Sequence, residues 1–207
     1  MIQGLLNYGR RYLGGGRQER RRVAYEIRLR LRGIDLSGAT LDELGLSDDR
    51  ANEYSNSGGP DLDDLLVLAQ IPRDIAALDL GCGKGGALLT LAGHFTRVAG
   101  LDLNPELLAT ASRNLRKSHV TAQLIQADAA EFLDYDPYGA VYMYNPFPGC
   151  VMEAAAANIA LSVRRTPRPF WLIYKNPLHH ESLTGAGFRA SGEFPCGKHY
   201  ARIYQPG

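Results

Sequence analysis

The stretch from Leu78 to Gly86, with the sequence LDLGCGKGG, constrains the fold of this chain more than any other. The apolar residues 75–80 run directly into the glycine-rich stretch, and the apolar residues 87–92 follow it. This order predicts a strand, a tight turn and a helix, because glycine adopts backbone conformations that other residues avoid. The free N–H groups at the helix start and the bare glycine backbone favour a nucleotide-like or anionic ligand at the turn.

Two classes of cofactor compete for this turn, beside a glycine-rich turn that holds no ligand. The spacing Gly81-x-Gly83-x-x-Gly86, with Asp102 further along the chain, satisfies the dinucleotide fingerprint of NAD-dependent oxidoreductases. The carboxylate of Asp79 argues against a bound pyrophosphate, because two negative charges so close together repel. A carboxylate at the strand end instead favours a ligand that presents a positively charged group.

Composition limits the class of protein. The chain has 207 residues, of which 45% are hydrophobic, and this suits one α/β domain with a short extension. No stretch approaches the roughly 20 apolar residues of a membrane span. The first residues lack a secretory pattern, so we expect a cytoplasmic protein. The three cysteines show no metal-ligand spacing, so free thiols and no metal site are predicted.

Residues 1–60 are predicted to be a helical N-terminal extension. Residues 10–32 hold nine arginines and two glutamates, which gives this segment a charge of +7. Within it, Val23, Ile27 and Leu31 recur at helical spacing and predict an apolar face opposite the arginines. The basic face suits a solvated cap on the main domain, contact with an acidic or nucleic-acid partner, or contact with a membrane surface.

The second half of this extension is acidic and rich in turn residues. Thr40 and Glu43 have the spacing of a capping box, which predicts a short helix. Asp61 is expected to cap a further helix over residues 62–70. Tyr54 and the loop after it precede the main domain, and they are either a lid over its site or a plain connector.

From residue 75 onward, strands and helices alternate. This pattern implies a doubly wound, mostly parallel sheet with helices on both faces. We expect strands at 75–80, 96–102, 121–127, 139–144 and 169–175, and helices at 85–93, 105–117, 150–163 and 179–185. Two last strands, at 188–194 and 199–204, are so close in sequence that they must form an antiparallel hairpin. Residues 61–207 are therefore predicted to be one α/β domain with a seven-stranded sheet.

The pattern Asp79-x-Gly81-x-Gly83-x-Gly85 resembles motif I of the class I S-adenosylmethionine (SAM)-dependent methyltransferases. The predicted sheet with its final hairpin is similar to the Rossmann-like fold of that family, and small bacterial methyltransferase-domain proteins are a narrower match. The resemblance implies SAM as cofactor and S-adenosylhomocysteine as product. It places Asp79 near the methionine amino group, and the glycine loop, including Lys84, under the methionine and ribose.

The next two strands end in residues that match the adenosine contacts of the family. By this resemblance, Asp102 accepts hydrogen bonds from both ribose hydroxyls, and Leu103 contacts one adenine face. Asp128 accepts from the adenine amino group, and Ala129 donates to adenine from its backbone. Each carboxylate alone has the alternative role of a helix cap.

The fourth strand ends in Asn145-Pro146-Phe147-Pro148, which resembles motif IV of the amino-methylating branch of the family. In that branch the Asn side chain and the carbonyl of the first proline accept hydrogen bonds from the target amino group, and the aromatic ring stacks on a planar substrate. Here Phe147 stands where the branch has its second proline. Asn145 and Pro146 therefore either orient a nucleophile in line with the methyl group or only shape the pocket wall. Asn145 is also expected to contact the cofactor.

The resemblance implies methyl transfer to nitrogen or oxygen of a small molecule or of a protein or peptide side chain. A nucleic-acid amino methyltransferase is the first alternative, in which the basic helix holds phosphates and Phe147 stacks a flipped base. A non-catalytic, SAM-binding regulatory module is the second. The methyl acceptor is the expected partner, and the sequence indicates neither its identity nor the oligomeric state.

Overall fold

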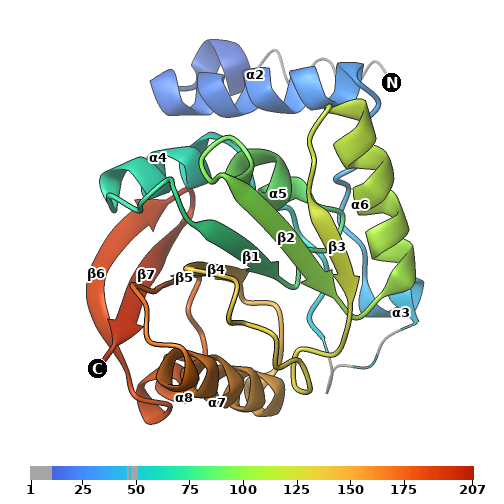
Figure 1. Ribbon diagram of the computed structural model, residues 1–207. Coiled ribbons are helices and arrows are strands. Elements are labelled where there is room, and N and C mark those ends of the chain that lie inside the picture. Colours follow the sequence, from blue (N-terminus) through green and yellow to red (C-terminus); the bar gives the residue numbers. More distant parts are fainter. Residues whose placement is uncertain (1–10, 46, 48–50) are drawn as a thin grey trace.

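A seven-stranded sheet forms the centre of the protein, in a computed structural model that describes residues 11–45, 47 and 51–207 (Figure 1). The strand order is β3-β2-β1-β4-β5-β7-β6. The strands are β1 (Ala76–Leu80), β2 (Arg97–Asp102), β3 (Gln123–Gln126), β4 (Ala140–Tyr144), β5 (Trp171–Lys175), β6 (Phe188–Cys196) and β7 (His199–Pro206). Strands β1 to β5 pair in parallel, whereas β7 is antiparallel to both β5 and β6. The predicted fold class, with its C-terminal hairpin, is confirmed.

Helices cover both faces of the sheet (Figure 1). One face carries α4 (Pro60–Leu68), α5 (Gly86–Leu91) and α6 (Pro105–Lys117), and the other carries α7 (Gly149–Arg165) and α8 (His180–Gly185). Two helices of the N-terminal extension, α2 (Arg17–Leu31) and the short α3 (Leu41–Leu44), precede them. The capping box predicted for α3 is present, since the Thr40 hydroxyl accepts from Glu43 N and the Glu43 carboxylate accepts from Thr40 N.

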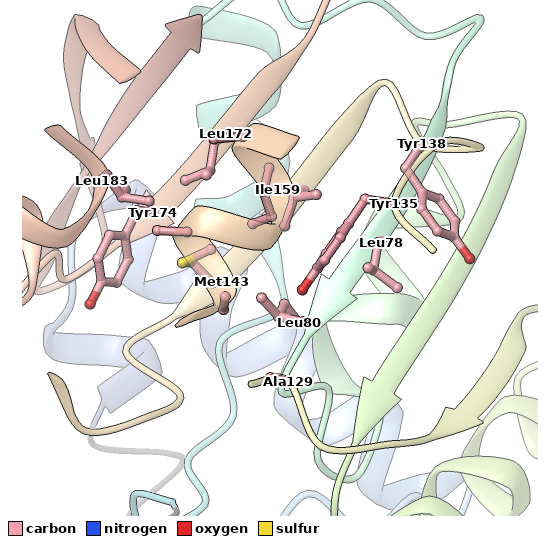
Figure 2. Packing of buried hydrophobic residues seen from close by; sticks show 14 of the residues in the cluster. Leu78, Leu80, Ala129, Tyr135, Tyr138, Met143, Ile159, Leu172, Tyr174 and Leu183 are labelled. Carbon is pink, nitrogen blue, oxygen red and sulfur yellow. The ribbon is translucent and has the colours of Figure 1, made fainter. Parts of the chain in front are cut away.

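The alternation of side chains along β1 decides where its acidic residue lies. Leu78 and Leu80 point toward α7, and Figure 2 shows them packed with Met143, Leu172 and Ile159. Because successive strand residues point to opposite faces, Asp79 faces the side that α5 and the N-terminal extension cover. A strand buried on both faces is ordinarily apolar throughout, so a carboxylate there is exceptional.

Helix α2 lies across α4 and contacts it largely through charge (Figure 1). An Arg21 nitrogen lies 2.6 Å from Asp64 Oδ2, and Arg22 Nε lies 2.7 Å from Asp61 Oδ2. Such partly exposed pairs contribute at most about 1 kcal/mol each, so they orient the helix more than they stabilise it. These contacts support the interpretation of α2 as a cap on the main domain.

Two predictions for this region are wrong in detail. The apolar face of α2 is incomplete, because Val23 is fully buried but Ile27 and Leu31 are 36% and 83% exposed. Asp61 does not cap α4, which begins at Pro60 with Gly59 as its N-cap. Proline suits the first helical position because it has no N–H group to satisfy.

Two features were not found among the described residues. No helix among them is long and apolar enough to cross a membrane. No group of three or more His, Cys, Asp or Glu side chains in this part of the chain is arranged to hold a metal ion.

Candidate active site

The glycine loop joins β1 to α5 in backbone conformations that only glycine adopts readily. The φ angles of Gly81, Gly83 and Gly85 are 82°, 52° and 78°. The N–H groups of Gly81 and Cys82 both donate to the carbonyl of Leu101, each over 2.9 Å, and this ties the loop to the end of β2. The predicted strand, turn and helix are therefore present in order.

Asp102, at the end of β2, holds the loop from the other side. Its Oδ2 accepts from Gly83 N over 2.7 Å, and its Oδ1 accepts from Asn104 N over 2.9 Å. Burial raises the pKa of this carboxyl, although the N–H groups that it accepts from act in the opposite direction. A carboxylate oxygen can accept more than one hydrogen bond, so Asp102 also fits the ribose hydroxyls of a nucleoside.

Asp79 is the most unusual group of the site. Its side chain is 3% exposed, and among the described residues its Oδ2 has no hydrogen-bond partner. Burial, with the neighbouring charge of Asp102, raises the pKa of Asp79 to about 8. A buried polar atom without a partner is costly, so its presence indicates a missing partner. An ammonium group is the complement that this carboxyl fits.

Residues 33–59, of which 46 and 48–50 lie outside the described residues, cross the carboxyl ends of the strands; we call this segment the strap. At its start, the Lys84 ammonium lies 3.1 Å from Asp35 Oδ2 and 3.0 Å from the Ser37 hydroxyl. Asn114 Nδ2 donates to the carbonyl of Asp35 over 2.8 Å. Lys84 thus fastens the strap to the glycine loop, and the cofactor contact expected from it stays a prediction.

Further contacts fasten the strap to three other strand ends. Asn104 Nδ2 donates to the carbonyl of Leu44 over 2.9 Å at the end of β2. Asn52 Nδ2 donates to the carbonyl of Asn145 over 2.9 Å at the end of β4. At the end of β5, the ammonium of Lys175 donates to the strap at Ser57. The strap therefore covers the edge at which parallel α/β sheets bind their ligands.

Tyr54 of the strap lies over the glycine loop. A Cβ atom added to Gly83 would come within 2.3 Å of the Tyr54 ring, so the ring rests directly on the glycine backbone. The Tyr54 hydroxyl is buried and has no hydrogen-bond partner within the described ranges. Burial raises the pKa of this hydroxyl, and the nearby Asp79 raises it further.

A cavity of about 60 Å³ remains between the strap and the loop. It brings together six of the predicted site residues, namely Gly81, Gly83, Asp102, Leu103, Pro146 and Phe147. The other predicted residues lie outside its lining. Gly85 packs against Ala111, Asp128 Oδ1 accepts from Ala130 N over 2.9 Å, and Ala129 is buried in the core. The adenine contacts expected from Asp128 and Ala129 stay predictions.

The motif at the end of β4 turns sharply toward this cavity. Asn145 has a φ of 40°, a conformation that Asn accepts better than most residues. Its Oδ1 accepts from the Tyr174 hydroxyl over 3.4 Å. Phe147 is buried, and one of its ring atoms would lie 3.5 Å from a Cβ on Gly81. Its ring is thus a wall of the cavity, and stacking on an acceptor stays a prediction.

Three asparagines that assemble the site were not predicted from the sequence. Asn52, Asn104 and Asn114 each donate to a backbone carbonyl of a distant segment. Contacts between residues so far apart leave no spacing in the sequence. The one available signal was Asn104 directly before Pro105, which marks it as the N-cap of α6 but not as a partner of the strap.

Residues 77–166, from β1 to the end of α7, match the family described as a methyltransferase domain. The chain carries a class I SAM-dependent methyltransferase domain. The cofactor of this family is SAM, and the buried, unpartnered Oδ2 of Asp79 fits its methionine amino group. Asp102, which borders the cavity, fits its ribose.

The methyltransferase domain is similar to proteins with different named acceptors. It is 38% identical over 71 residues to a probable cobalt-precorrin-6B C(15)-methyltransferase (decarboxylating) of Methanothermobacter thermautotrophicus, covering 33% of this chain and 37% of that protein. It is 33% identical over 61 residues to a protein-lysine N-methyltransferase of Saccharolobus islandicus, covering 28% and 38%. The matches thus span little more than a third of these curated relatives.

The fold is shared with solved methyltransferase structures. A ribosomal protein L11 methylase from Lactobacillus delbrueckii subsp. bulgaricus superposes with a TM-score of 0.58 at 12% identity, covering 70% of this chain and 76% of that one. At so low an identity, this likeness extends to the fold alone.

Proposed function

We propose that this protein transfers the methyl group of SAM to a nitrogen or oxygen atom of a small molecule or of a polypeptide side chain. The observation that carries the proposal is the Asp79 carboxyl, buried at the end of β1 with one oxygen unpartnered among the described residues. A dinucleotide would bring a pyrophosphate to this position and would be repelled. A methionine amino group would instead supply the missing partner.

In this proposal some residues bind the cofactor and others position the methyl acceptor. Bound SAM supplies a methyl group on a positively charged sulfur, which needs no metal for activation. Asp79 would hold the amino group and Asp102 the ribose. Asn145 Oδ1 and the Pro146 carbonyl would accept hydrogen bonds from the acceptor, which keeps its lone pair in line with the methyl group. The Pro146 carbonyl now accepts from Asn52 N over 3.2 Å, so the strap occupies the acceptor's place.

We propose that the strap acts as a lid. In this proposal residues 1–60 are an extension that carries the lid, and residues 61–207 are the methyltransferase domain. Pockets for ligands of this size measure about 300–1,000 Å³. The cavity under the strap is only about 60 Å³, with Tyr54 over its floor. Binding of SAM then requires the strap to move away from the loop.

Tyr54→Ala is expected to raise the association rate of SAM by about tenfold, because the ring no longer has to leave the loop before the cofactor enters. Stopped-flow fluorescence with SAM measures this rate. Tyr200→Ala, which removes a partly exposed tyrosine from β7, is the matched control and should leave the rate unchanged. An unchanged or slower rate in Tyr54→Ala would show that the strap is not a lid.

Calorimetric titration with SAM, S-adenosylhomocysteine and NAD in parallel tests the proposed cofactor. We expect the two sulfur compounds to bind and NAD not to bind. Binding of NAD alone would overturn the proposal. Binding of SAM without product from any acceptor class in a cell extract would instead favour the non-catalytic regulatory module.

Asn145→Ala is expected to lower turnover by about 100-fold while SAM affinity stays within about threefold, because the side chain orients the acceptor and not the cofactor. Turnover is followed as release of S-adenosylhomocysteine, with the cell extract as the source of acceptor. Asn158→Ala, which removes an amide from α7 that donates to the carbonyl of Ala130, is the control. Normal turnover in Asn145→Ala would refute the motif IV assignment.

A further inference from the structure

Lys175, at the end of β5, carries a buried ammonium group. The residue is 8% exposed, and its Nζ donates to the carbonyl of Ser57 over 3.3 Å and lies 4.7 Å from the centroid of the Tyr144 ring. Within the described part of the chain, no carboxylate forms an ion pair with it. An ammonium group has three donors, and buried charges are ordinarily paired. The partners of Lys175 are one carbonyl and one aromatic ring, and neither carries a negative charge.

Lys175 borders a cavity of about 240 Å³ that is distinct from the cofactor cavity. The turn between β6 and β7 forms one wall through Lys198 and His199, and Asn56 of the strap forms another. Tyr144 also lines this cavity, with its hydroxyl 3.2 Å from His199 Nε2. Lys198 is exposed, which places the mouth of the cavity at the surface.

The acidic residues around this cavity are already paired. Asp61 Oδ2 lies 2.7 Å from Arg22 Nε, and the Glu26 carboxylate lies 2.8 Å from a nitrogen of Arg11. The neighbouring Cys196 thiol keeps its proton, because burial raises its pKa. Arginines therefore engage these two carboxylates, and within the described residues neither forms an ion pair with Lys175.

The charges of the two lysines also act on the imidazole of His199. Partial burial lowers the pKa of its imidazole, and the charges of Lys198 and Lys175 lower it further. Burial likewise lowers the pKa of Lys175, although the nearby Asp61 acts in the opposite direction. An anion bound in the cavity would supply a counter-charge to the ammonium groups of both Lys175 and Lys198.

We propose that this cavity binds an anionic group, a carboxylate or a phosphate, of a small ligand, with Lys175 and Lys198 as counter-charges and the Tyr144 hydroxyl as a hydrogen-bond partner. Tyr144 and Asn145 share the end of β4 but the strap separates their cavities, so an acceptor with an anionic end would have to reach past the strap from this cavity to Asn145. This use of the site rests on the proposed methyl transfer, whereas anion binding itself does not.

Proton NMR of the His199 imidazole in the full chain, without SAM, tests the proposal. Inorganic phosphate and succinate are titrated separately against chloride at equal ionic strength, and His199→Gln identifies the signal. We expect a saturable change with phosphate, succinate or both, and a pKa of His199 that rises toward its ordinary value. Phosphate alone would identify a phosphorylated ligand, and succinate alone a carboxylate; each supports the site.

Lys175→Met should weaken this binding by about tenfold or more, because a charged hydrogen bond is lost. Removing a buried, unpaired charge is compatible with folding, and the exposed Lys198→Ala provides a second variant with the same expected direction. Arg164→Ala removes one positive charge from α7, on the opposite face, and should bind as the wild type does. Absence of a saturable change in the wild type, or equal binding by Lys175→Met, would overturn the site. Failure of SAM to bind would refute the proposed function and leave the anion result standing.

Discussion

Asp79→Asn is expected to weaken SAM binding by about 100-fold, because the amino group of the cofactor loses a buried ionic partner. Asparagine has nearly the same shape and keeps one acceptor oxygen, so the pocket is preserved. Calorimetric titration gives the affinity. Asp74→Asn, at an exposed position just before β1, is the control and should bind SAM normally.

The same substitution should stabilise the free protein at neutral pH. The raised pKa of Asp79, about 8, means that the folded chain holds a proton which the unfolded chain releases near pH 4. The stability of the wild type therefore falls as pH rises from about 4 to about 8. Asparagine removes this dependence, so the free energy of unfolding should rise by roughly 2–4 kcal/mol at pH 7 and little at pH 4. Urea unfolding at both pH values measures the difference.

An Asp79→Asn variant that binds SAM as well as the wild type would contradict the role assigned to Asp79.

Gly58→Ala is expected to lower the free energy of unfolding by about 3 kcal/mol, because the added methyl group overlaps backbone. A Cβ at this position would lie 2.1 Å from the carbonyl oxygen of Gly86 and 2.6 Å from its carbonyl carbon. Gly86 is the first residue of α5, so neither atom can move aside without disturbing the glycine loop. The strap must shift instead and give up its contacts with Gly83 and Lys175.

Urea denaturation measures this loss, with Gly185→Ala as the matched control. Gly185 ends α8, and a Cβ there meets nothing within 4 Å. Alanine is a better helix residue than glycine, so the control should be neutral or more stable by about 0.5–1 kcal/mol. If Gly58→Ala and the wild type had the same free energy of unfolding, the strap could shift away from Gly86 without losing stability, and the prediction would be wrong.

The sheet and the glycine loop could be predicted from the sequence because their signals are local. Strands buried on both faces are continuous apolar runs, and a helix such as α6 is marked by the Asn104 cap and the proline after it. The same local signals placed Asp79 in β1, Gly81 and Gly83 in the loop after it and Asp102 at the end of β2, where the structure has them.

The contacts of the strap could not be predicted in this way, although a lid was one of the two interpretations of Tyr54 and the loop after it. The contact of Lys84 with Asp35 spans 49 residues of sequence, and that of Asn52 with Asn145 spans 93. Such pairs depend on how the finished sheet brings distant segments together. The apolar face predicted for α2 is incomplete for a related reason, since a helix that docks through arginines does not need a complete apolar face.

One short segment of backbone, residues 54–58, is a partition between two cavities. Tyr54 and Ser55 line the cavity beside the glycine loop, whereas Asn56 and Gly58 line the cavity beside Lys175. A ligand that displaces this partition from one side changes the volume available on the other. Binding at the two cavities is then thermodynamically linked. If one ligand changes the affinity of the other by some factor, the second ligand changes the affinity of the first by the same factor.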